Sequence, residues 1–401
     1  MSEKKDRSKK PYSRRNFISV ASSATVGLTG LSSTLPASQG VEPAADPPPV
    51  VLEWRNKVES MAYRQLGRTG MMISEVVNGG DPVRLDNYKQ VNVALERGVN
   101  YLDMAPQYGR GECEEAYAKI LDSPSKRQNV FLTTKVSGFD NVRNDMYQDI
   151  LKGLPSEKQN KIYARAKEIR AERYVDKPGY FLLYWPGQDT SMDKGFISNA
   201  MVSDYGHLVD GSEQYKEKIK SSLEGSLKRV GTDHFDILMC PHGANCAEEV
   251  SIPEIYSTFK ELKQEGKVRY LGFSSHNDPA GVLRAAADSG EYDMAMVAYN
   301  VINGGYLDAT IKHAADQGMG IIAMKAAMAV ATHHEAIKPI PEWRISKVDR
   351  IVPGNLKAPL KAYLWALQNP NISAVISNLW DEQFINENLS IVGTKVELNP
   401  G

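Results

Sequence analysis

Four polar side chains follow successive apolar segments of the chain. Together they could form a proton donor and the groups that charge, orient and stabilise it. Asp103 ends the segment YLD, Lys135 ends FLTTK, and Tyr108 lies five residues beyond Asp103. His242 lies just beyond a further apolar segment, in MCPHG. A tyrosine is a weak acid with a pKa of about 10, and a neighbouring ammonium group stabilises its phenolate and lowers that pKa.

This combination predicts a site that protonates a developing alkoxide. We expect Lys135 to stabilise the phenolate of Tyr108, with Asp103 keeping the lysine charged and in place. His242 is expected to orient a carbonyl oxygen. The hydride itself must come from a cofactor. Each residue alone has an ordinary structural explanation, such as a helix cap for the aspartate, so the hypothesis depends on the four occurring together in this order.

Short apolar segments alternate with helical patterns from residue 63 onward, which predicts how these side chains are positioned. The glycines in YRQLGRTGMMIS (63–74) indicate an N-terminal β-hairpin. Strands are expected at 75–79, 99–103, 129–135, 235–240, 268–273, 294–298, 320–324 and 373–377. Helices are expected at 86–97, 111–121, 213–230, 252–265, 278–289, 305–317, 357–369 and 381–391. Eight strands alternating with eight helices favour a (β/α)8 TIM barrel, in which the polar groups meet at the carboxyl ends of the strands. An open doubly wound sheet is the alternative, but no GxGxxG follows any strand.

A long insert, 137–212, follows the third strand of the expected barrel. It therefore lies on the face where barrel enzymes build their sites, and loops of this length are usually functional or partly ordered. The pattern at 156–173 indicates a helix with charges spread around it. The aromatic segment YFLLYWP (180–186) either packs the insert onto the barrel or forms a wall of a substrate cleft.

The sequence resembles the aldo-keto reductases over roughly 62–392. The matching stretches are YRQLGRTGMMIS, RGVNYLDMAPQYGRGE, VFLTTK, SLKRVGTDHFDILMCPH, GKVRYLGFSSH, GMGIIAMK and ISAVISNLWDEQFINENL. The resemblance implies a (β/α)8 barrel with Asp103, Tyr108, Lys135 and His242 as the catalytic residues. It further implies NAD(P)H-dependent carbonyl reduction, or the reverse alcohol oxidation.

The resemblance also implies positions that bind the nicotinamide nucleotide. These positions hold Ser274, Ser275, Met296, Met324, Lys325, Gln383, Glu387 and Asn388. Several depart from the family pattern: Ser275 replaces an asparagine, Met296 a glutamine, and Met324 the aromatic residue that often stacks on the nicotinamide. Gln383, or Phe384 after a one-residue gap, falls where relatives often place an arginine against the 2′-phosphate. The resemblance implies NADP(H) as the default cofactor. Because neither Gln383 nor Phe384 carries a charge, NAD(H) is the alternative, while Lys325 offers a compensating charge for a phosphate.

The amino-terminal residues predict an export signal. Residues 1–15 carry a net charge of +5, and the rest of the chain carries −6. The segment SRRNFI (13–18) has the twin-arginine pattern, and an uncharged, weakly apolar stretch runs from there to Gly40. A stable membrane span is the weaker interpretation because this stretch is not predominantly apolar. We expect export of the folded protein to the periplasm or another extracytoplasmic compartment, with the export machinery as a partner.

The domain organisation follows from these segments. Residues 1–40 are expected to form the signal region and 41–61 a proline-containing linker, with a short helical turn in 52–61. The barrel with its insert spans 62–392, and 393–401 form a C-terminal tail.

The composition limits the classes of partner and cofactor. The chain has 401 residues, 42% of them hydrophobic and 24% charged, with a net charge of −1, which argues against nucleic acid as a partner. Three cysteines without a CxxC pair exclude a disulfide scaffold and argue against a cysteine-ligated cluster. His333 and His334 lack further ligands at a suitable spacing, so no metal site is expected. A small-molecule carbonyl or alcohol is the expected substrate.

Two other functions remain open on the sequence. The departures at Ser275, Met296 and Met324 are compatible with a binding protein on the same barrel whose cofactor site has decayed. A structural role is the third hypothesis, with the insert 137–212 as a docking surface.

Overall fold

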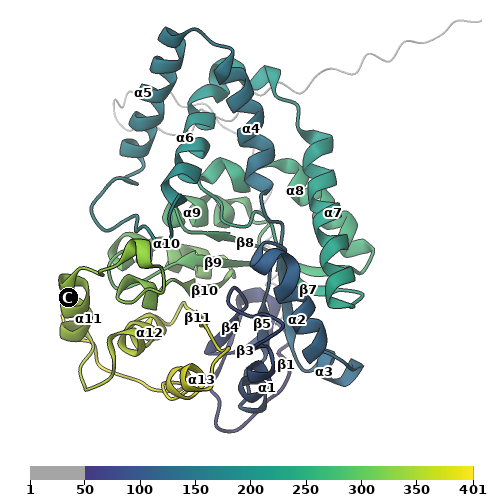
Figure 1. The fold of residues 1–401 in the computed structure, drawn as a ribbon, viewed down its shortest axis with the longest axis vertical. Coiled ribbons are helices and arrows are strands. Elements are labelled where there is room, and N and C mark those ends of the chain that lie inside the picture. Colours follow the sequence, from purple (N-terminus) through teal and green to yellow (C-terminus); the bar gives the residue numbers. More distant parts are fainter. Residues whose placement is uncertain (1–49, 401) are drawn as a thin grey trace, which may run out of the picture. The chain divides into compact units, whose positions relative to one another are not determined.

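Eight parallel strands form a closed barrel in the computed structural model, which describes residues 50–400. The ring order is β10-β11-β4-β5-β6-β7-β8-β9 (Figure 1). The strands are β4 (Val76–Gly79), β5 (Tyr101–Asp103), β6 (Phe131–Lys135), β7 (Phe235–Met239), β8 (Val268–Ser275), β9 (Met294–Ala298), β10 (Gly320–Met324) and β11 (Ala374–Ser377). The predicted (β/α)8 barrel is therefore confirmed, and each expected strand is present.

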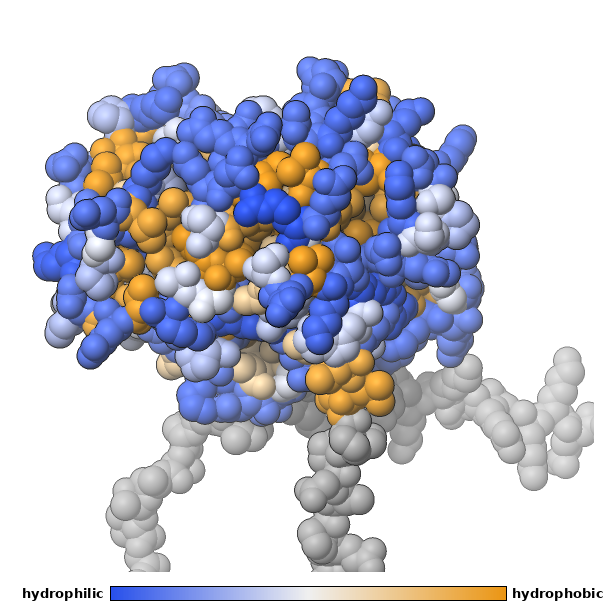
Figure 2. Space-filling model, turned by 90° about the horizontal axis from the view of Figure 1, so that it is seen from below, coloured by the Kyte–Doolittle hydropathy of each residue, from blue (hydrophilic) through white to orange (hydrophobic). Residues whose placement is uncertain are grey.

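Helices cover the outside of the barrel and turn their apolar sides toward the strands. The helices outside the insert are α1 (Lys89–Glu96), α2 (Glu112–Ile120), α3 (Pro124–Gln128), α7 (Ser212–Val230), α8 (Pro253–Gln264), α9 (Pro279–Ser289), α10 (Gly304–Asp316), α11 (Glu342–Ile351), α12 (Ala358–Gln368) and α13 (Glu382–Leu389). In α8 the buried residues Ile255, Phe259 and Leu262 follow helical spacing, so one side of the helix faces the core. Figure 2 shows hydrophilic side chains over most of the face it displays, with hydrophobic ones between them. None of the helices within residues 50–400 has the length and apolar character needed to cross a membrane.

The expected N-terminal hairpin closes the amino end of the barrel. Strand β2 (Tyr63–Gln65) pairs antiparallel with β3 (Met71–Ser74). Leu66, at the hairpin's turn, is fully buried in the cluster that fills the barrel interior. Gly67 has φ +50°, and a Cβ there would lie 2.2 Å from the backbone nitrogen of Gly320 in β10. Only glycine permits this close approach of the hairpin to the barrel.

One sequence expectation about the linker is wrong. Residues 52–61 were expected to contribute a helical turn, but Glu53–Trp54 form the strand β1, which pairs parallel with β3. The physical reason is charge pairing. Arg55 donates to the carbonyl oxygen of Val130 and pairs with the buried Asp236, which holds this segment extended against the barrel.

The insert is a bundle of three helices at the carboxyl end of the barrel. They are α4 (Phe139–Lys152), α5 (Ser156–Glu172) and α6 (Gln188–Tyr205), and they lie side by side in Figure 1. The sequence predicts α5, whereas α4 and α6 were not predicted; nor were α3 and α11. Two apolar clusters hold the bundle together, one of which includes Phe196 of α6 and Cys246 of the barrel. The insert is thus packed onto the barrel through a core of its own.

The C-terminal tail also contacts the barrel. The backbone nitrogen of Val396 donates to the side chain of Gln368 in α12, and that of Asn399 donates to the carbonyl oxygen of Ile351 in α11. The predicted signal region, 1–40, lies outside the described residues.

Candidate active site

The four predicted catalytic residues converge at the carboxyl end of three neighbouring strands. Asp103 ends β5 and Lys135 ends β6, and both side chains are buried. His242 follows β7, and its ring meets that of Tyr108 edge-on, with centroids 5.6 Å apart. The parallel strands bring these side chains together because β5, β6 and β7 are neighbours in the barrel.

Lys135 is the centre of the hydrogen-bonding network at this site. Its Nζ donates to Asp103 Oδ1, to Tyr108 Oη at 3.0 Å and to the carbonyl oxygen of Met104 at 3.2 Å. The three donors of an ammonium group therefore all have acceptors, which fits a charged lysine. Because Lys135 donates to Tyr108 Oη, the phenolic proton must point elsewhere. It is available to Asp103 Oδ2, at 3.5 Å, or to a ligand.

A tight left-handed turn positions Tyr108 in front of the lysine. Gly109, Arg110 and Gly111 have φ values of +57°, +58° and +98°, so three consecutive residues adopt a conformation that L-residues disfavour. A Cβ on Gly109 would lie 2.8 Å from Arg84 Nε, so the turn also packs tightly. Strained backbone held by its surroundings is typical of functional sites.

The electrostatics keep the tyrosine protonated. Burial, followed by the negative charge of Asp103, holds the pKa of Tyr108 well above its ordinary value. The sequence predicted the opposite direction from the Lys135 ammonium alone, and this expectation is wrong because desolvation and the nearby carboxylate outweigh the cation. Burial also raises the pKa of Asp103, and the Lys135 charge opposes that shift. Tyr108 is therefore a phenol, the form that donates a proton.

His242 is held as a neutral imidazole. Burial lowers its pKa well below the ordinary value, and the charges of Lys135 and Lys325 act in the same direction. Its Nδ1 lies 2.9 Å from the hydroxyl oxygen of Ser137. When that hydroxyl donates, the imidazole proton resides on Nε2 and is free to hydrogen-bond a substrate oxygen. The sequence analysis did not identify Ser137, although it follows the strand-end lysine by only two residues.

Three more side chains lie at the same mouth of the barrel. Trp185, from the insert, packs edge-on against His276 with ring centroids 4.8 Å apart. Lys325 follows β10, and its Nζ lies 5.3 Å from the centroid of the Trp185 ring. No role was predicted for His276, and two alternative roles were predicted for the aromatic segment. Tyr180 and Tyr184 are buried, so the segment packs the insert onto the barrel, whereas a wall of a substrate cleft formed by the half-buried Trp185 stays a prediction.

The predicted nicotinamide-side residues line this mouth but are partly engaged already. Ser274 Oγ accepts from the backbone nitrogen of Gly243 at 2.9 Å, which leaves its hydroxyl proton available to a ligand. Ser275 Oγ instead donates to the carbonyl oxygen of Ala244 at 2.8 Å. Met296 and Met324 belong to the apolar cluster inside the barrel. They offer polarizable contacts without hydrogen-bond donors.

The predicted adenine-side residues lie on α13, after the last barrel strand. Glu387 accepts from Lys357 Nζ at 2.6 Å and from Gln383 Nε2 at 2.9 Å. Asn388 donates to Ser377 Oγ at 2.8 Å. Trp380, just before α13, has a buried indole Nε1 with no hydrogen-bond partner among the described residues. Trp380 Nε1 and the Ser274 hydroxyl are thus two donors at the predicted cofactor positions that a bound nucleotide would find unused.

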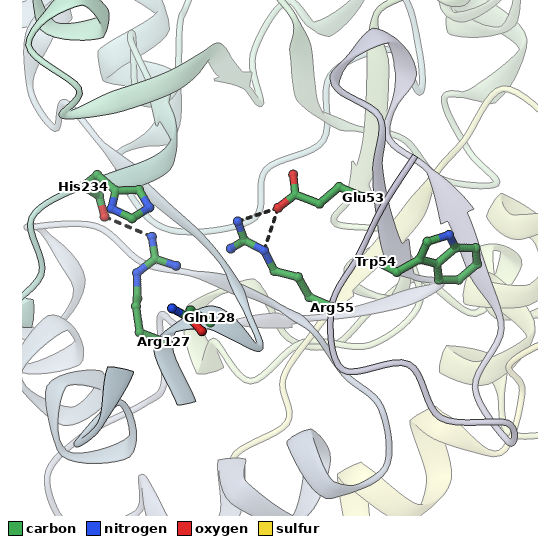
Figure 3. Close-up of a pocket in the computed structure, with 6 residues that line it drawn as sticks. All are labelled: Glu53, Trp54, Arg55, Arg127, Gln128 and His234. Carbon is green, nitrogen blue, oxygen red and sulfur yellow. Dashed lines mark hydrogen bonds and ion pairs between the residues drawn. The ribbon is translucent and has the colours of Figure 1, made fainter. Parts of the chain in front are cut away.

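A separate hollow lies at the opposite end of the barrel, where the strands begin. Figure 3 shows its lining residues: Glu53, Trp54, Arg55, Arg127, Gln128 and His234. The arginines there are paired: Arg127 donates to the carbonyl oxygen of His234, and Arg55 pairs with Glu53. Both also pair with the buried Asp236. These charges are already neutralised, so we interpret this hollow as part of the scaffold.

Neither the histidine pair nor the cysteines add a second reactive centre. No group of three or more histidine, cysteine, aspartate or glutamate side chains within residues 50–400 is arranged to hold a metal ion. The rings of His333 and His334 stack on each other, with centroids 4.2 Å apart. Burial raises the pKa of Cys240 and Cys246 well above the ordinary value, so neither thiol is activated.

Comparison with known proteins gives one consistent family. The sequence profile of the Aldo/keto reductase family matches residues 77–342. An uncharacterized oxidoreductase, YqkF of Bacillus subtilis (strain 168), is 27% identical over 218 residues, covering 54% of this chain and 49% of the relative. L-galactose dehydrogenase of Arabidopsis thaliana is 24% identical, covering 47% of this chain and 61% of that protein. The matches thus span about half the length of these curated relatives.

Solved structures agree on the fold. The holo form of aldo-keto reductase AKR11C1 from Bacillus halodurans superimposes with a TM-score of 0.54 and 20% sequence identity. That match covers 84% of this chain and 92% of the other. The inhibitor-bound aldo-keto reductase Tm1743 gives a TM-score of 0.51 at 19% identity.

Proposed function

Because the chain belongs to the aldo-keto reductase family, we propose that it is an NAD(P)(H)-dependent oxidoreductase that interconverts a carbonyl and an alcohol, with Tyr108 as the general acid and base. The observation that carries this proposal is the hydrogen bond from Lys135 to a protonated Tyr108, beside the neutral His242. Tyr108 is then the proton donor, Lys135 is the cation that stabilises the phenolate left behind, and His242 is the hydrogen-bond donor to the carbonyl oxygen.

The chain's own residues account for the proton transfer. Tyr108 gives its phenolic proton to the carbonyl oxygen, and Lys135 then stabilises the phenolate through the hydrogen bond already in place. Asp103 keeps the lysine charged and oriented. The Nε2 proton of His242 holds the carbonyl oxygen in front of Tyr108. The nicotinamide nucleotide, when bound, supplies the hydride to the carbonyl carbon.

Ser274, Met296, Met324 and Trp380 are the residues that would hold the nucleotide. The methionines offer an apolar surface at the barrel mouth, and Ser274 and Trp380 offer unused donors. The neutral Gln383 provides no charge for a 2′-phosphate. NADP(H) remains the proposal from the family, and NAD(H) the alternative.

The proposed acid is tested by Tyr108→Phe, which removes only the phenolic hydroxyl. We expect carbonyl reduction to fall by a factor of about 10² to 10⁴, the contribution typical of a general acid. The dissociation constant of the nucleotide should change little. Tyr270→Phe is the control, since the Tyr270 hydroxyl bonds the carbonyl oxygen of Thr69 at the other end of the barrel. Activity of Tyr108→Phe within a few-fold of wild type would remove Tyr108 as the acid.

A binding protein without catalysis is the second candidate, and one observation favours it. Ser275, Glu387 and Asn388 are engaged in hydrogen bonds within the protein. Titration of wild-type protein with NADPH and NADH separates the two functions. A reductase binds at least one of them and oxidises it with an aldehyde present, whereas a protein with a decayed site does neither.

We also propose that the protein is exported in its folded state through the twin-arginine segment SRRNFI (13–18). Support comes from the order of basic residues, paired arginines and weakly apolar stretch. Nucleotide acquired before export would then accompany the protein. Assaying protein purified after export for bound nucleotide tests this directly.

A further inference from the structure

Lys325 is a half-buried cation that contacts no carboxylate among residues 50–400. Its Nζ lies 5.3 Å from the ring centroid of Trp185 and 5.8 Å from that of Tyr184, and it donates weakly to Met328 Sδ at 3.4 Å. Asp81 acts on its charge only from a distance. Aromatic faces attract a cation but do not neutralise it. A buried charge without a counter-charge is costly, so an anion bound beside Lys325 would be stabilised.

His276 provides a second, independent sign of a ligand. Its Nδ1 is buried and has no hydrogen-bond partner in the described part of the chain. Its ring packs edge-on against Trp185. Buried polar atoms are nearly always paired, so an unpaired one next to an unpaired cation indicates a missing polar ligand.

Both groups lie on the side of the mouth where the proton is transferred. A Cβ on Gly243, the residue after His242, would lie 3.9 Å from His276 Cδ2, and the charge of Lys325 acts on both imidazoles. The contacts of Lys325 are with the insert and with Met328, and none is with α13. An anion held here is therefore close to the reacting carbonyl.

We propose that Lys325, His276 and Trp185 form a subsite that binds a carboxylate carried by the carbonyl substrate. This inference rests on the proposed function and narrows its substrate class to anionic aldehydes and ketones. Lys325 pairs with the carboxylate, and His276 donates a hydrogen bond to it. The face of Trp185 covers the part of the substrate that joins the carboxylate to the carbonyl. The insert therefore contributes directly to specificity.

The test compares two aldehydes that differ only in charge: 4-carboxybenzaldehyde and its methyl ester, methyl 4-formylbenzoate. Wild-type protein is expected to have the lower KM for the acid. Lys325→Met should raise the acid-to-ester ratio of KM about tenfold, since a charge-assisted hydrogen bond is lost. Lys325→Arg keeps the charge and should preserve the wild-type preference. Lys338→Met is the control, because Lys338 lies on the same connection, is exposed, and pairs with Glu335.

In these kinetic measurements, two outcomes would overturn the proposal. The first is an acid-to-ester ratio that does not change in Lys325→Met. The second is a rise in the nucleotide dissociation constant with equal rises in both KM values, which would assign Lys325 to a phosphate of the cofactor.

A binding measurement keeps this test independent of the proposed reaction. Benzoate and the neutral benzamide are titrated while tryptophan fluorescence is recorded, with Trp185→Phe identifying the signal from the subsite. Wild-type protein should bind benzoate more tightly than benzamide, and Lys325→Met should lose that difference. If neither aldehyde is reduced but benzoate binds in this way, the proposed function fails and the subsite stands. If benzoate and benzamide bind equally to wild type, the subsite is wrong.

Discussion

At the scale of single residues, the mouth of the barrel holds titratable groups whose pKa values move in opposite directions. Burial raises the pKa of Tyr108 and lowers those of His242 and Lys325, the last to about 8. At neutral pH this gives a protonated phenol, a neutral imidazole and a charged amine. Each of these is the form that its proposed role requires.

The first prediction concerns pH. Above its folded pKa of about 8, Lys325 loses the charge that binds the substrate carboxylate, so KM for 4-carboxybenzaldehyde should rise as pH increases through this value. A bound carboxylate raises the pKa of Lys325 in the complex, so the rise in KM should level off only at a pH above that higher value. The titratable groups whose charges interact with Lys325 are Asp81, Lys135, His242, His276 and His334.

The methyl ester provides the contrast for this measurement. Its kcat should stay level from about pH 6.5 to about 9, because Tyr108 remains protonated and His242 neutral across that range. Initial rates of both aldehydes over this range give the two profiles. A rise or fall of kcat for the ester near pH 7 would contradict the protonation states described for Tyr108 and His242.

The second prediction concerns the choice of nucleotide. Gln383 is exposed, and its side chain donates to Glu387. The neighbouring Asp381 caps α13 by accepting from the backbone nitrogens of Gln383 and Phe384. Gln383→Arg adds a positive charge at this exposed position, and we expect the affinity for NADP relative to NAD to rise about fivefold. Fluorescence titration with both nucleotides measures the ratio. Gln383→Glu should move it the other way, and an unchanged ratio in both variants would show that this position does not face the 2′ group.

At the scale of elements, three arginines join separate parts of the chain at the foot of the barrel. Arg55 beyond β1, Arg127 of α3 and Arg269 of β8 all pair with the buried Asp236 of β7. The backbone nitrogen of Leu132 in β6 also donates to this carboxylate, at 2.8 Å. One aspartate thus fixes the positions of four barrel-end segments.

The third prediction follows from that arrangement. Asp236→Asn leaves Arg127 without its counter-charge and leaves Arg55 and Arg269 with Glu53 alone, so the free energy of unfolding should fall by about 3 kcal/mol. Urea denaturation at neutral pH measures it. Asp149→Asn is the control, because its pair with Lys152 is exposed and should make no measurable difference. The arginines lower the pKa of Asp236, so its contribution should be present at neutral pH and lost in acid. Equal stability of Asp236→Asn and wild type would contradict this account.

Besides its apolar clusters, the insert is joined to the barrel by buried polar side chains, of which the Gln188 amide is one. Gln188 is fully buried; it accepts from the backbone nitrogen of Tyr184 at 2.7 Å and donates to Asn277 Oδ1 at 2.9 Å. Asn277 in turn donates to Asn245 beyond β7. These bonds hold the segment that carries Trp185.

The fourth prediction is that Gln188→Ala loosens this segment. We expect faster limited proteolysis between residues 174 and 188 and a higher KM for 4-carboxybenzaldehyde, with a smaller effect on kcat. Gln159→Ala is the matched control, since Gln159 bonds only the carbonyl oxygen of Leu154 within the insert. Proteolysis of Gln188→Ala at the wild-type rate would show that other contacts hold the segment.

The sequence predicts the barrel better than the insert, for a physical reason. Strands buried on both faces are continuous apolar runs, so β9 and β10 were predicted with the residue bounds that the structure has. Helix α6 packs between α4 and α5 and has no single apolar side. It buries Gln188 and Ser198, and a Cβ on Gly195 would come within 3.0 Å of Asn245. No periodic pattern marks such a helix.

The residues of the candidate site were likewise predicted where they belong to the barrel and missed where they depend on the insert. Asp103, Lys135 and His242 were predicted because strand ends in a closed barrel share one face. Trp185 and His276 meet only because the insert folds back over the mouth, and spacing along the chain gives no sign of that contact. The direction of the Tyr108 pKa shift was mispredicted because burial cannot be read from residue type.

At the scale of the whole molecule, the fifth prediction concerns export. Arg14→Lys together with Arg15→Lys preserves charge but removes the arginine pair, so we expect the protein to remain in the cytoplasm. Cell fractionation measures the distribution. Lys4→Arg with Lys5→Arg, in the same basic segment, serves as control and should leave export intact. Normal export of the Arg14, Arg15 variant would remove the twin-arginine interpretation.

Closure of the barrel has a consequence for how the protein is made. Strand β4 pairs with β11 through Val76 and Val375, which are about 300 residues apart in the chain. A ribosome adding about 5 to 20 residues per second needs roughly 15 to 60 seconds to produce the second partner after the first. During that time the outer edge of β4 has no strand beside it, and an open edge pairs readily with other chains. Protection of this edge by a chaperone during synthesis would therefore improve the yield of folded protein.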